Sequence, residues 1–159
     1  MAVITKEIHF HMGHRVPSHQ GKCRFPHGHT YHLRVYVEGD LVNLKGDQEE
    51  GMVMDFGFLR DLIEERIKGT FDHRLALHTR DPLLQVLSDG MRNRRDVGFL
   101  SEGIVQLTFV PTAENLAQHF FNILEGLVEH RSAGRSHLKK VTLFETPTSS
   151  ASVTERVDV

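Results

Sequence analysis

Cysteine is almost absent from this chain, which has one such residue, Cys23, among 159. A single thiol excludes a disulfide within the chain, and chains without disulfides are typical of reducing compartments. No apolar run approaches the ~20 residues that a membrane-spanning helix needs, and the first residues lack the pattern of a secretory signal. We therefore expect a cytoplasmic protein without a membrane partner.

An excess of positive charge is also missing. The chain has 19 lysines and arginines against 21 acidic residues, which gives a net charge of −2 with histidine neutral. A protein that binds nucleic acid usually needs a basic surface, so we expect no nucleic-acid partner. The length suits one domain of ordinary size, and no linker or repeat divides the chain. Residues 1–159 are therefore expected to form a single domain.

Histidine, by contrast, is abundant and unevenly placed. Of the 12 histidines, seven lie within the first 32 residues: His9, His11, His14, His19, His27, His29 and His32. Side chains of a strand alternate between faces, so His27 and His29 would project to the same side. With His14 from a neighbouring strand they would form a three-imidazole site with an open position, the pattern of catalytic zinc. The alternative is that they are surface histidines without a ligand.

Cys23 lies in a polar loop between Lys22 and Arg24, close in sequence to these histidines. Positive neighbours favour the thiolate, which is the reactive form of the side chain. An isolated free cysteine is more often a small buried apolar residue. Cys23 could also be a fourth zinc ligand, which would close the coordination sphere and make the site structural. Spacing in the sequence leaves these three interpretations open.

Three acidic residues are candidates for catalysis or binding. Asp72 precedes His73 and could orient it as a proton carrier, but only in a turn, because adjacent residues of a strand point apart. Glu145 ends an apolar strand, where it could accept two parallel hydrogen bonds from a ring such as a 2-aminopyrimidinone. Glu114 falls in the first turn of an expected helix, where the helix dipole alone favours an acid. Each of these side chains could instead be solvated and without a role.

Apolar periodicity predicts an α+β fold, with two main helices on one face of a mainly antiparallel sheet. Strands are expected at residues 3–12, 27–38, 104–110, 139–145 and 152–159. The main helices are expected after the N-cap residues Asp55 and Thr112, the first of them ending at Gly69. A short helix is expected at Asp81-Pro82, and a solvated basic turn after it at Arg92, Arg94 and Arg95.

Six short motifs follow one another along the chain: Phe10-His11-Met12-Gly13-His14, Cys23-x-x-x-His27-Gly28-His29, Gly51-Met52-Val53-Met54-Asp55-Phe56, Phe71-Asp72-His73, Pro111-Thr112-Ala113-Glu114-Asn115 and Phe144-Glu145-Thr146. The ordered set resembles the family of 6-pyruvoyltetrahydropterin synthase and 6-carboxytetrahydropterin synthase and covers most of the chain. The three-residue gap between Cys23 and His27 is more similar to the bacterial carboxy enzyme of the queuosine pathway.

Two features depart from the family pattern. The segment at about 80–110 is longer than in compact members, and His9, His11 and His32 have no role in the pattern.

The resemblance implies a fold, a metal and a substrate. The fold would be the tunnelling fold, whose subunits join their sheets into a barrel, usually as a hexamer of two trimers. The metal would be Zn²⁺, bound by His14, His27 and His29. The substrate would be 7,8-dihydroneopterin triphosphate, and the products 6-carboxytetrahydropterin, acetaldehyde and triphosphate. The alternatives are an enzyme that stops at 6-pyruvoyltetrahydropterin and a zinc-stabilised module that binds pterins or purines without turnover.

The resemblance also implies roles for the remaining candidates. Cys23 would be the catalytic base, and Asp72 with His73 would relay protons, from the same or a neighbouring subunit. The pterin ring would be held by Glu145, Thr112 and Glu114. The residue chemistry agrees, because zinc can stabilise an enolate, a thiolate can take a proton and a histidine can return one. Charge alone suggests three residues for the triphosphate: Arg15, Lys22 and Arg24.

Overall fold

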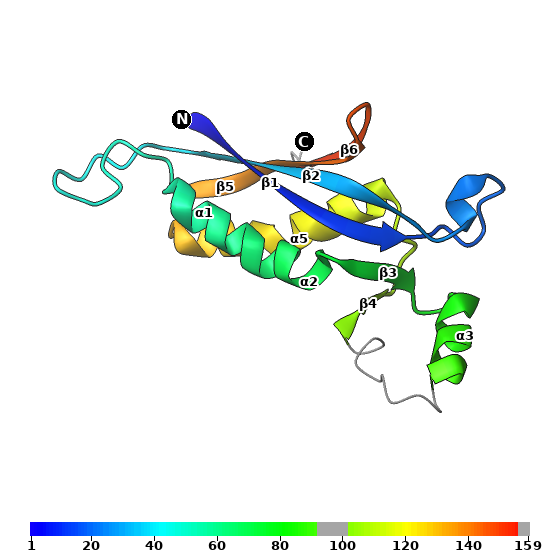
Figure 1. The fold of residues 1–159 in the computed structure, drawn as a ribbon. Helices are drawn as coiled ribbons and strands as arrows, with labels where there is room; N and C mark the ends of the chain where they lie inside the picture. The colour runs from blue at the N-terminus through cyan, green and yellow to red at the C-terminus, as the bar shows by residue number, and fades with distance from the viewer. Residues whose placement is uncertain (92–101, 156–159) are drawn as a thin grey trace.

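The computed structural model describes residues 1–91 and 102–155, and a six-stranded sheet is its largest element (Figure 1). The strands are β1 (Ala2–His14), β2 (His27–Gly39), β3 (Arg74–His78), β4 (Ile104–Leu107), β5 (Ser136–Thr146) and β6 (Ser149–Thr154). Across the sheet they follow the order β4-β3-β1-β2-β5-β6. The pairs β1–β2, β2–β5 and β5–β6 are antiparallel, whereas β1–β3 and β3–β4 are parallel. The sheet is therefore mixed and mainly antiparallel, as predicted.

The hairpin of β1 and β2 forms the centre of the sheet. Its strands pair along their full length, and the register places His14 opposite His27. Strict alternation buries one face of the hairpin, where Phe10 and Tyr31 have no exposed surface. Figure 1 shows the helices α1 and α5 packed on one side of this sheet. The arrangement is the α+β fold that the sequence predicts.

Helix α1 (Phe56–Ile63) begins after Asp55, whose carboxylate accepts a hydrogen bond from a first-turn amide at 2.8 Å. The predicted N-cap is thus confirmed. The predicted end at Gly69 is wrong, because the helix continues through the π-helical segment η2 (Glu64–Lys68) into α2 (Gly69–Phe71). Gly69 keeps a right-handed helical backbone, with φ −57° and ψ −25°, and so does not adopt the left-handed conformation that ends many helices at glycine.

Helix α5 (Ala113–Arg131) begins after Thr112, whose hydroxyl accepts a hydrogen bond from a first-turn amide at 3.4 Å. Helix α3 (Pro82–Met91) begins after Asp81, whose carboxylate accepts one from a first-turn amide at 2.9 Å. The N-cap at Thr112 and the short helix at Asp81-Pro82 are therefore confirmed. Two other predictions lie outside the described residues, namely the basic turn at Arg92, Arg94 and Arg95 and the last four residues of the final strand, 156–159.

Several strand bounds differ from the prediction: β1 and β5 extend beyond the predicted 3–12 and 139–145 at both ends, and three other strands differ for reasons of pairing. The sequence does not predict β3, because Arg-Leu-Ala-Leu-His lacks alternation, and parallel pairing with β1 and β4 holds it extended. Strand β4 ends at Leu107 rather than Val110, since its partner β3 ends at His78, the residue opposite Leu107. Strand β6 begins at Ser149, earlier than expected, because a tight turn already pairs Ser149 with Thr146.

Aromatic side chains join the sheet to the helices. Phe10 stacks on Tyr31 with ring centroids 5.4 Å apart, and it meets Phe120 of α5 edge to face at 6.0 Å. Phe120 in turn contacts Phe71 of α2 at 5.1 Å. All four rings are buried, so a packed core supports the end of the hairpin that carries His14.

Among residues 1–91 and 102–155, none of the helices has both the length and the apolar character needed to cross a membrane.

Candidate functional site

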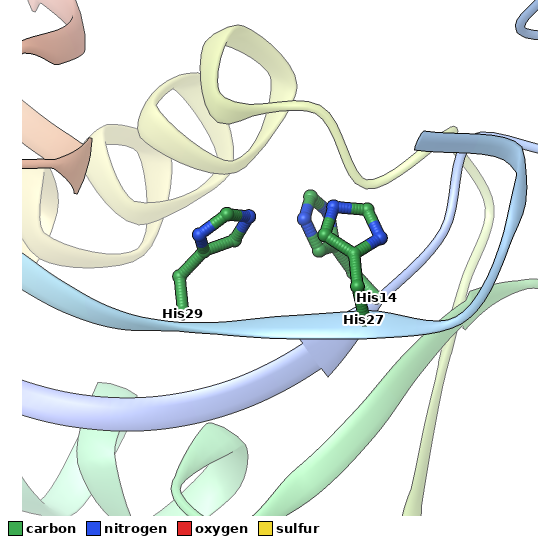
Figure 2. A group of neighbouring side chains, drawn as sticks. All are labelled: His14, His27 and His29. Carbon is green, nitrogen blue, oxygen red and sulfur yellow. The ribbon is translucent and has the colours of Figure 1, made fainter. Parts of the chain in front are cut away.

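Three histidines come together at one end of the β1–β2 hairpin. His14 is the last residue of β1, and His27 and His29 lie at the start of β2. Figure 2 shows their rings projecting from the hairpin to the same side. One ring nitrogen from each histidine lies within 4.8 Å of the others. Small side-chain rotations would let all three nitrogens reach one metal ion.

Gly28 separates the two histidines of β2 and allows β1 to approach closely. A Cβ atom at residue 28 would lie 3.1 Å from the carbonyl oxygen of Met12, which is tighter than most side chains accept. Gly28 faces Gly13 across the hairpin, so the two strands meet here without side chains between them. A larger residue at position 28 would push β2 away and displace His27 and His29.

Backbone carbonyls fix the orientation of two of the three rings. Nδ1 of His14 lies 2.7 Å from the carbonyl oxygen of Pro111, and Nδ1 of His27 lies 2.8 Å from that of Phe25. A carbonyl oxygen can only accept, so Nδ1 carries the proton in both rings, and Nε2 of the neutral ring keeps its lone pair. Metal-binding histidines normally have their second nitrogen held in this way.

Burial leaves these histidines short of hydrogen-bond partners. His14 is only 2% exposed, and Nε2 of His14 and of His29 are buried without a hydrogen bond to any described residue. Burial lowers the pKa of both side chains, which favours the neutral imidazole that binds zinc-like cations. Unpaired buried nitrogens are costly unless a ligand satisfies them. The donor set therefore fits a divalent metal ion of this kind.

Glu145 of β5 faces two of these rings, those of His14 and His29. Its Oε1 atom lies 3.3 Å from Nε2 of His14 and 3.9 Å from Nε2 of His29, without the alignment of a hydrogen bond. The Tyr31 hydroxyl donates to the same oxygen at 3.5 Å, and burial together with the Glu145 charge raises the pKa of Tyr31. Glu145 therefore has partners and is 26% exposed, which favours a role in the site over a fully solvated strand end.

Cys23 lies in the short helical turn η1 (Lys22–Arg24) that connects β1 to β2. It lines a cavity of about 310 Å³ together with four other predicted site residues: His14, Glu145, Thr112 and Glu114. Among the described residues, the group of converging ligand atoms consists of the three histidines and does not include Cys23. The half-buried thiol is free, and its position beside the histidines suits a role in chemistry more than a fourth metal bond.

Among the other residues that line the cavity, three polar ones have no role in the sequence prediction: His19, Ser149 and Ser150. Nδ1 of His19 accepts a hydrogen bond from the Gly21 amide at 2.9 Å, so Nε2 of the neutral ring carries the proton and can donate it. His19 belongs to the histidine-rich first segment, which was a signal in the sequence. Nothing in the sequence indicates the two serines, because their position beside the cavity depends on the pairing of β5 with β6.

Asp72 and His73 form the turn that a cooperating pair requires. His73 has a left-handed backbone with φ 58°, which is rare and strained for a residue with a side chain. The turn is tied to β1, because the His11 amide donates to Oδ1 of Asp72 at 2.7 Å and the His73 amide donates to the His11 carbonyl at 2.6 Å. Nδ1 of His73 lies 3.1 Å from Oδ2 of Asp72. Burial opposes ionisation of Asp72, but the hydrogen bonds from His11 and His73 outweigh it and lower the Asp72 pKa.

This pair is not beside Cys23 in the described part of the chain. His73 lines a different cavity of about 590 Å³, together with His11, Thr30 and the predicted metal ligand His29, and its side chain is 77% exposed. One chain therefore presents the thiol in one cavity and His73 in another.

Arg15, which charge alone suggested for the triphosphate, has a different partner. Its Nε atom lies 3.2 Å from Oδ2 of Asp81, whose side chain is fully buried. This ion pair ties the end of β1 to the start of α3. Arg24 stacks over the ring of Phe25 at 4.8 Å. The geometry therefore lends no support to Arg15 as a ligand of the substrate.

Relatives of known name match nearly the whole chain. A family model described as 6-pyruvoyl tetrahydropterin synthase matches residues 3–156. The chain is 36% identical over 148 residues to the 6-carboxy-5,6,7,8-tetrahydropterin synthase of Rickettsia bellii, covering 92% of this chain and 96% of that protein. It is 32% identical over 152 residues to the protein of the same name from Haemophilus influenzae, covering 94% and 96%.

Solved structures share the fold. A protein of Wolinella succinogenes superposes with a TM-score of 0.80 at 26% identity and 98% coverage of each chain. The 6-pyruvoyl tetrahydropterin synthase of Plasmodium falciparum superposes with a TM-score of 0.68 at 20% identity, also over 98% of each chain, which is a likeness of fold alone. The predicted tunnelling fold is thus confirmed for the subunit. Sequence, fold and relatives agree that the chain belongs to the 6-pyruvoyl tetrahydropterin synthase family of enzymes.

Proposed function

We propose that the protein is a zinc-dependent 6-carboxy-5,6,7,8-tetrahydropterin synthase of 7-deazaguanine (queuosine) biosynthesis in the cytoplasm. It would convert 7,8-dihydroneopterin triphosphate and one water molecule to 6-carboxytetrahydropterin, acetaldehyde and triphosphate. The observation that carries the proposal is the convergence of three imidazoles beside a cavity that also contains Cys23 and Glu145. The names of the Rickettsia bellii and Haemophilus influenzae relatives support the choice of product.

His14, His27 and His29 would hold the zinc ion. When bound, zinc supplies a positive charge that stabilises the enolate oxygen formed when a carbon-bound proton leaves. The carbonyls of Pro111 and Phe25 keep two of the rings oriented and protonated on Nδ1. The burial of His14 keeps bulk water away, so charges in the site interact more strongly than they would in solvent.

Cys23 would take the proton from the substrate side chain, because it is the thiol that lines the cavity beside the histidines. Glu145 would hold the pterin through two parallel hydrogen bonds to its 2-aminopyrimidinone edge. Thr112 and Glu114 would complete the ring site from the N-terminus of α5. His19 lines the same cavity and offers a donor to an anionic part of the substrate.

The proton relay of Asp72 and His73 would require a second subunit. Within one chain His73 lines a different cavity from that of Cys23, so a neighbouring copy would supply the pair. We therefore propose a homohexamer, a dimer of trimers, in which the sheets join into a barrel. Each subunit would be a single domain over residues 1–159. Residues 92–101 of the longer segment at about 80–110 lie outside the described residues.

The reaction product is tested by incubating the enzyme with 7,8-dihydroneopterin triphosphate and measuring acetaldehyde and the pterin formed. We expect acetaldehyde and 6-carboxytetrahydropterin in equal amounts, with release of triphosphate. Accumulation of 6-pyruvoyltetrahydropterin without acetaldehyde would show that the reaction stops after elimination of triphosphate. In that case the proposed product is wrong, although the fold and the metal site would be unaffected.

The role of Cys23 is tested with Cys23→Ala, and Cys23→Ser serves as a control of similar size. We expect both variants to keep zinc and bind the pterin, and the rate of turnover to fall by at least about a hundredfold in the alanine variant. Loss of zinc in Cys23→Ala would instead make Cys23 a metal ligand. A wild-type protein that binds pterin but forms no product would favour a binding module over an enzyme.

A further inference from the structure

A second group of potential metal ligands lies on the opposite face of the β1–β2 hairpin. Glu7 and His9 alternate with buried residues of β1, and His32 alternates with buried residues of β2, so all three point away from the helices. In the described part of the chain no helix covers this face of the hairpin. The side chains of Glu7, His9 and His32 are 33%, 55% and 39% exposed. A ligand could therefore reach them from solvent.

The strand register brings the three side chains together. His9 pairs with His32 across the hairpin, and their rings stack with centroids 4.0 Å apart and planes 16° apart. Oε1 of Glu7 lies 3.4 Å from Nε2 of His9 and 3.6 Å from Nδ1 of His32. All three ligand atoms lie within 4.8 Å of one another. Two ligands bound tetrahedrally to zinc are about 3.4 Å apart, and both nitrogen–oxygen distances are close to this value. The lone pair of an imidazole lies in the ring plane, so the two stacked rings would have to rotate out of their near-parallel arrangement to direct both nitrogens at one ion.

Arg34 holds the carboxylate in position. Its Nε donates to Oε2 of Glu7 at 2.6 Å, and its guanidinium stacks over the ring of Phe144 at 4.8 Å. With Oε2 bound to Arg34, Oε1 is left to face the two imidazoles. Metal-binding carboxylates are usually supported by such an outer hydrogen bond.

We propose that Glu7, His9 and His32 form a second metal site, separate from the buried histidines. Two imidazoles and one carboxylate favour Zn²⁺, Co²⁺, Ni²⁺ or Cu²⁺ over Mg²⁺ and Ca²⁺, which prefer oxygen ligands. Binding is weaker than at the buried site, because the ligands are exposed and the positive charge of Arg34 lies beside them. A bound ion would link β1 to β2 at mid-hairpin and keep at least one coordination position open to solvent.

Metal titration of the whole protein tests this proposal. After removal of bound metal, Zn²⁺ is added and followed by calorimetry, with folding checked by circular dichroism. We expect two ions per chain with distinct affinities in the wild type. Glu7→Gln and His32→Gln should each lose only the weaker ion, and His27→Ala only the tighter one. His130→Gln alters an exposed histidine at the end of α5 and should bind as the wild type does.

A spectroscopic measurement identifies the ligands directly. With the buried site removed by His27→Ala, one equivalent of Cu²⁺ should give an electron paramagnetic resonance spectrum of an ion with two nitrogen ligands. Adding His32→Gln should leave one nitrogen or abolish binding. A wild type that binds a single ion overturns the proposal, and so does a weaker ion that survives in both Glu7→Gln and His32→Gln. Neither result bears on the proposed reaction, which uses the other face of the hairpin.

Discussion

Two groups of histidines lie on opposite faces of the β1–β2 hairpin, and they differ in how deeply their side chains are buried. His14 on the helix-covered face is 2% exposed, whereas the side chain of His9 on the open face is 55% exposed. The buried rings are oriented by backbone carbonyls, such as that of Pro111 for His14. The exposed rings face a carboxylate that is held by Arg34. On the covered face, Nδ1 of His14 and of His27 is held by a backbone carbonyl, while the Glu145 carboxylate lies beside His14 and His29. On the open face the imidazoles meet a carboxylate alone.

This difference shows why the buried face is the better place for catalysis. A backbone carbonyl cannot move far from its strand or loop. It can therefore orient His14 or His27 without a second side chain having to lose conformational freedom. In the low-dielectric interior, a metal charge would also act on a substrate more strongly than at the surface. The open face lacks both advantages, because solvent screens its charges. We therefore expect preorganised chemistry on the covered face and reversible metal binding on the open face.

The largest effect should follow from His14→Ala, which removes the most buried ligand of the covered face. We expect the tight metal ion to be lost and turnover to fall by at least about a hundredfold, because the charge that stabilises the transition state is lost. Metal content by mass spectrometry and the acetaldehyde assay are the measurements. His130→Ala, an exposed residue at the end of α5, is the matched control. A His14→Ala protein with full metal content and full activity would contradict the proposed ligand set.

The second prediction concerns Cys23 and His73, which line different cavities of one chain. Chains carrying Cys23→Ala and chains carrying His73→Ala should each be inactive alone. Co-expressed in equal amounts, they should recover about one quarter of wild-type activity, because random assembly joins an intact Cys23 to an intact His73 in that share of sites. No recovery in mixed oligomers, confirmed by two different tags, would mean that each chain supplies both groups to its own site.

The fold was predictable where local signals agree with long-range pairing. Asp55 and Thr112 have N-cap side chains and apolar periodicity after them, and both helices begin where expected. Gly69 has the residue type of a helix end, but packing of the following turn, with Phe71 fully enclosed, carries the helix past it. Strand β3 depends on parallel neighbours far away in sequence. Propensity within such a short segment carries no information about those neighbours.

In the candidate site too, local spacing was predictable from the sequence and long-range contacts were not. The spacing of His27 and His29 in a strand places them on one face, and the structure shows this. The carbonyl of Pro111 lies 97 residues after His14, and no periodicity indicates that the two meet. The separation of Asp72–His73 from Cys23 likewise follows from the position of β3 beside β1. Their roles remain predictions that the experiments above address.

A smaller effect is expected from Thr112→Ala, which removes the N-cap of α5 next to the carbonyl that orients His14. Loss of the cap should lower the free energy of unfolding by about 1 kcal/mol. The start of α5 would loosen with it, so affinity for the tight metal ion should fall slightly. Urea unfolding of the metal-free protein measures the first effect, with Thr112→Ser as the control that keeps the hydroxyl. Equal stability of the alanine and serine variants would exclude a capping contribution.

The smallest effect concerns His119 of α5, a histidine outside the group of three, which contacts the rings of Phe71 and Phe109. Burial lowers its pKa from the usual 6.5, so the unfolded chain binds a proton more readily than the folded one. Its contribution to stability is therefore complete above about pH 6.5 and is lost as the pH falls toward the lower folded-state pKa. His119→Leu should flatten the decline in unfolding free energy between about pH 7 and pH 5.5, whereas His130→Leu should leave that decline unchanged. Because His119 is only half-buried, solvent screening keeps the difference small. If the unfolding free energy of His119→Leu declines with falling pH as steeply as that of the wild type, the decline does not come from His119.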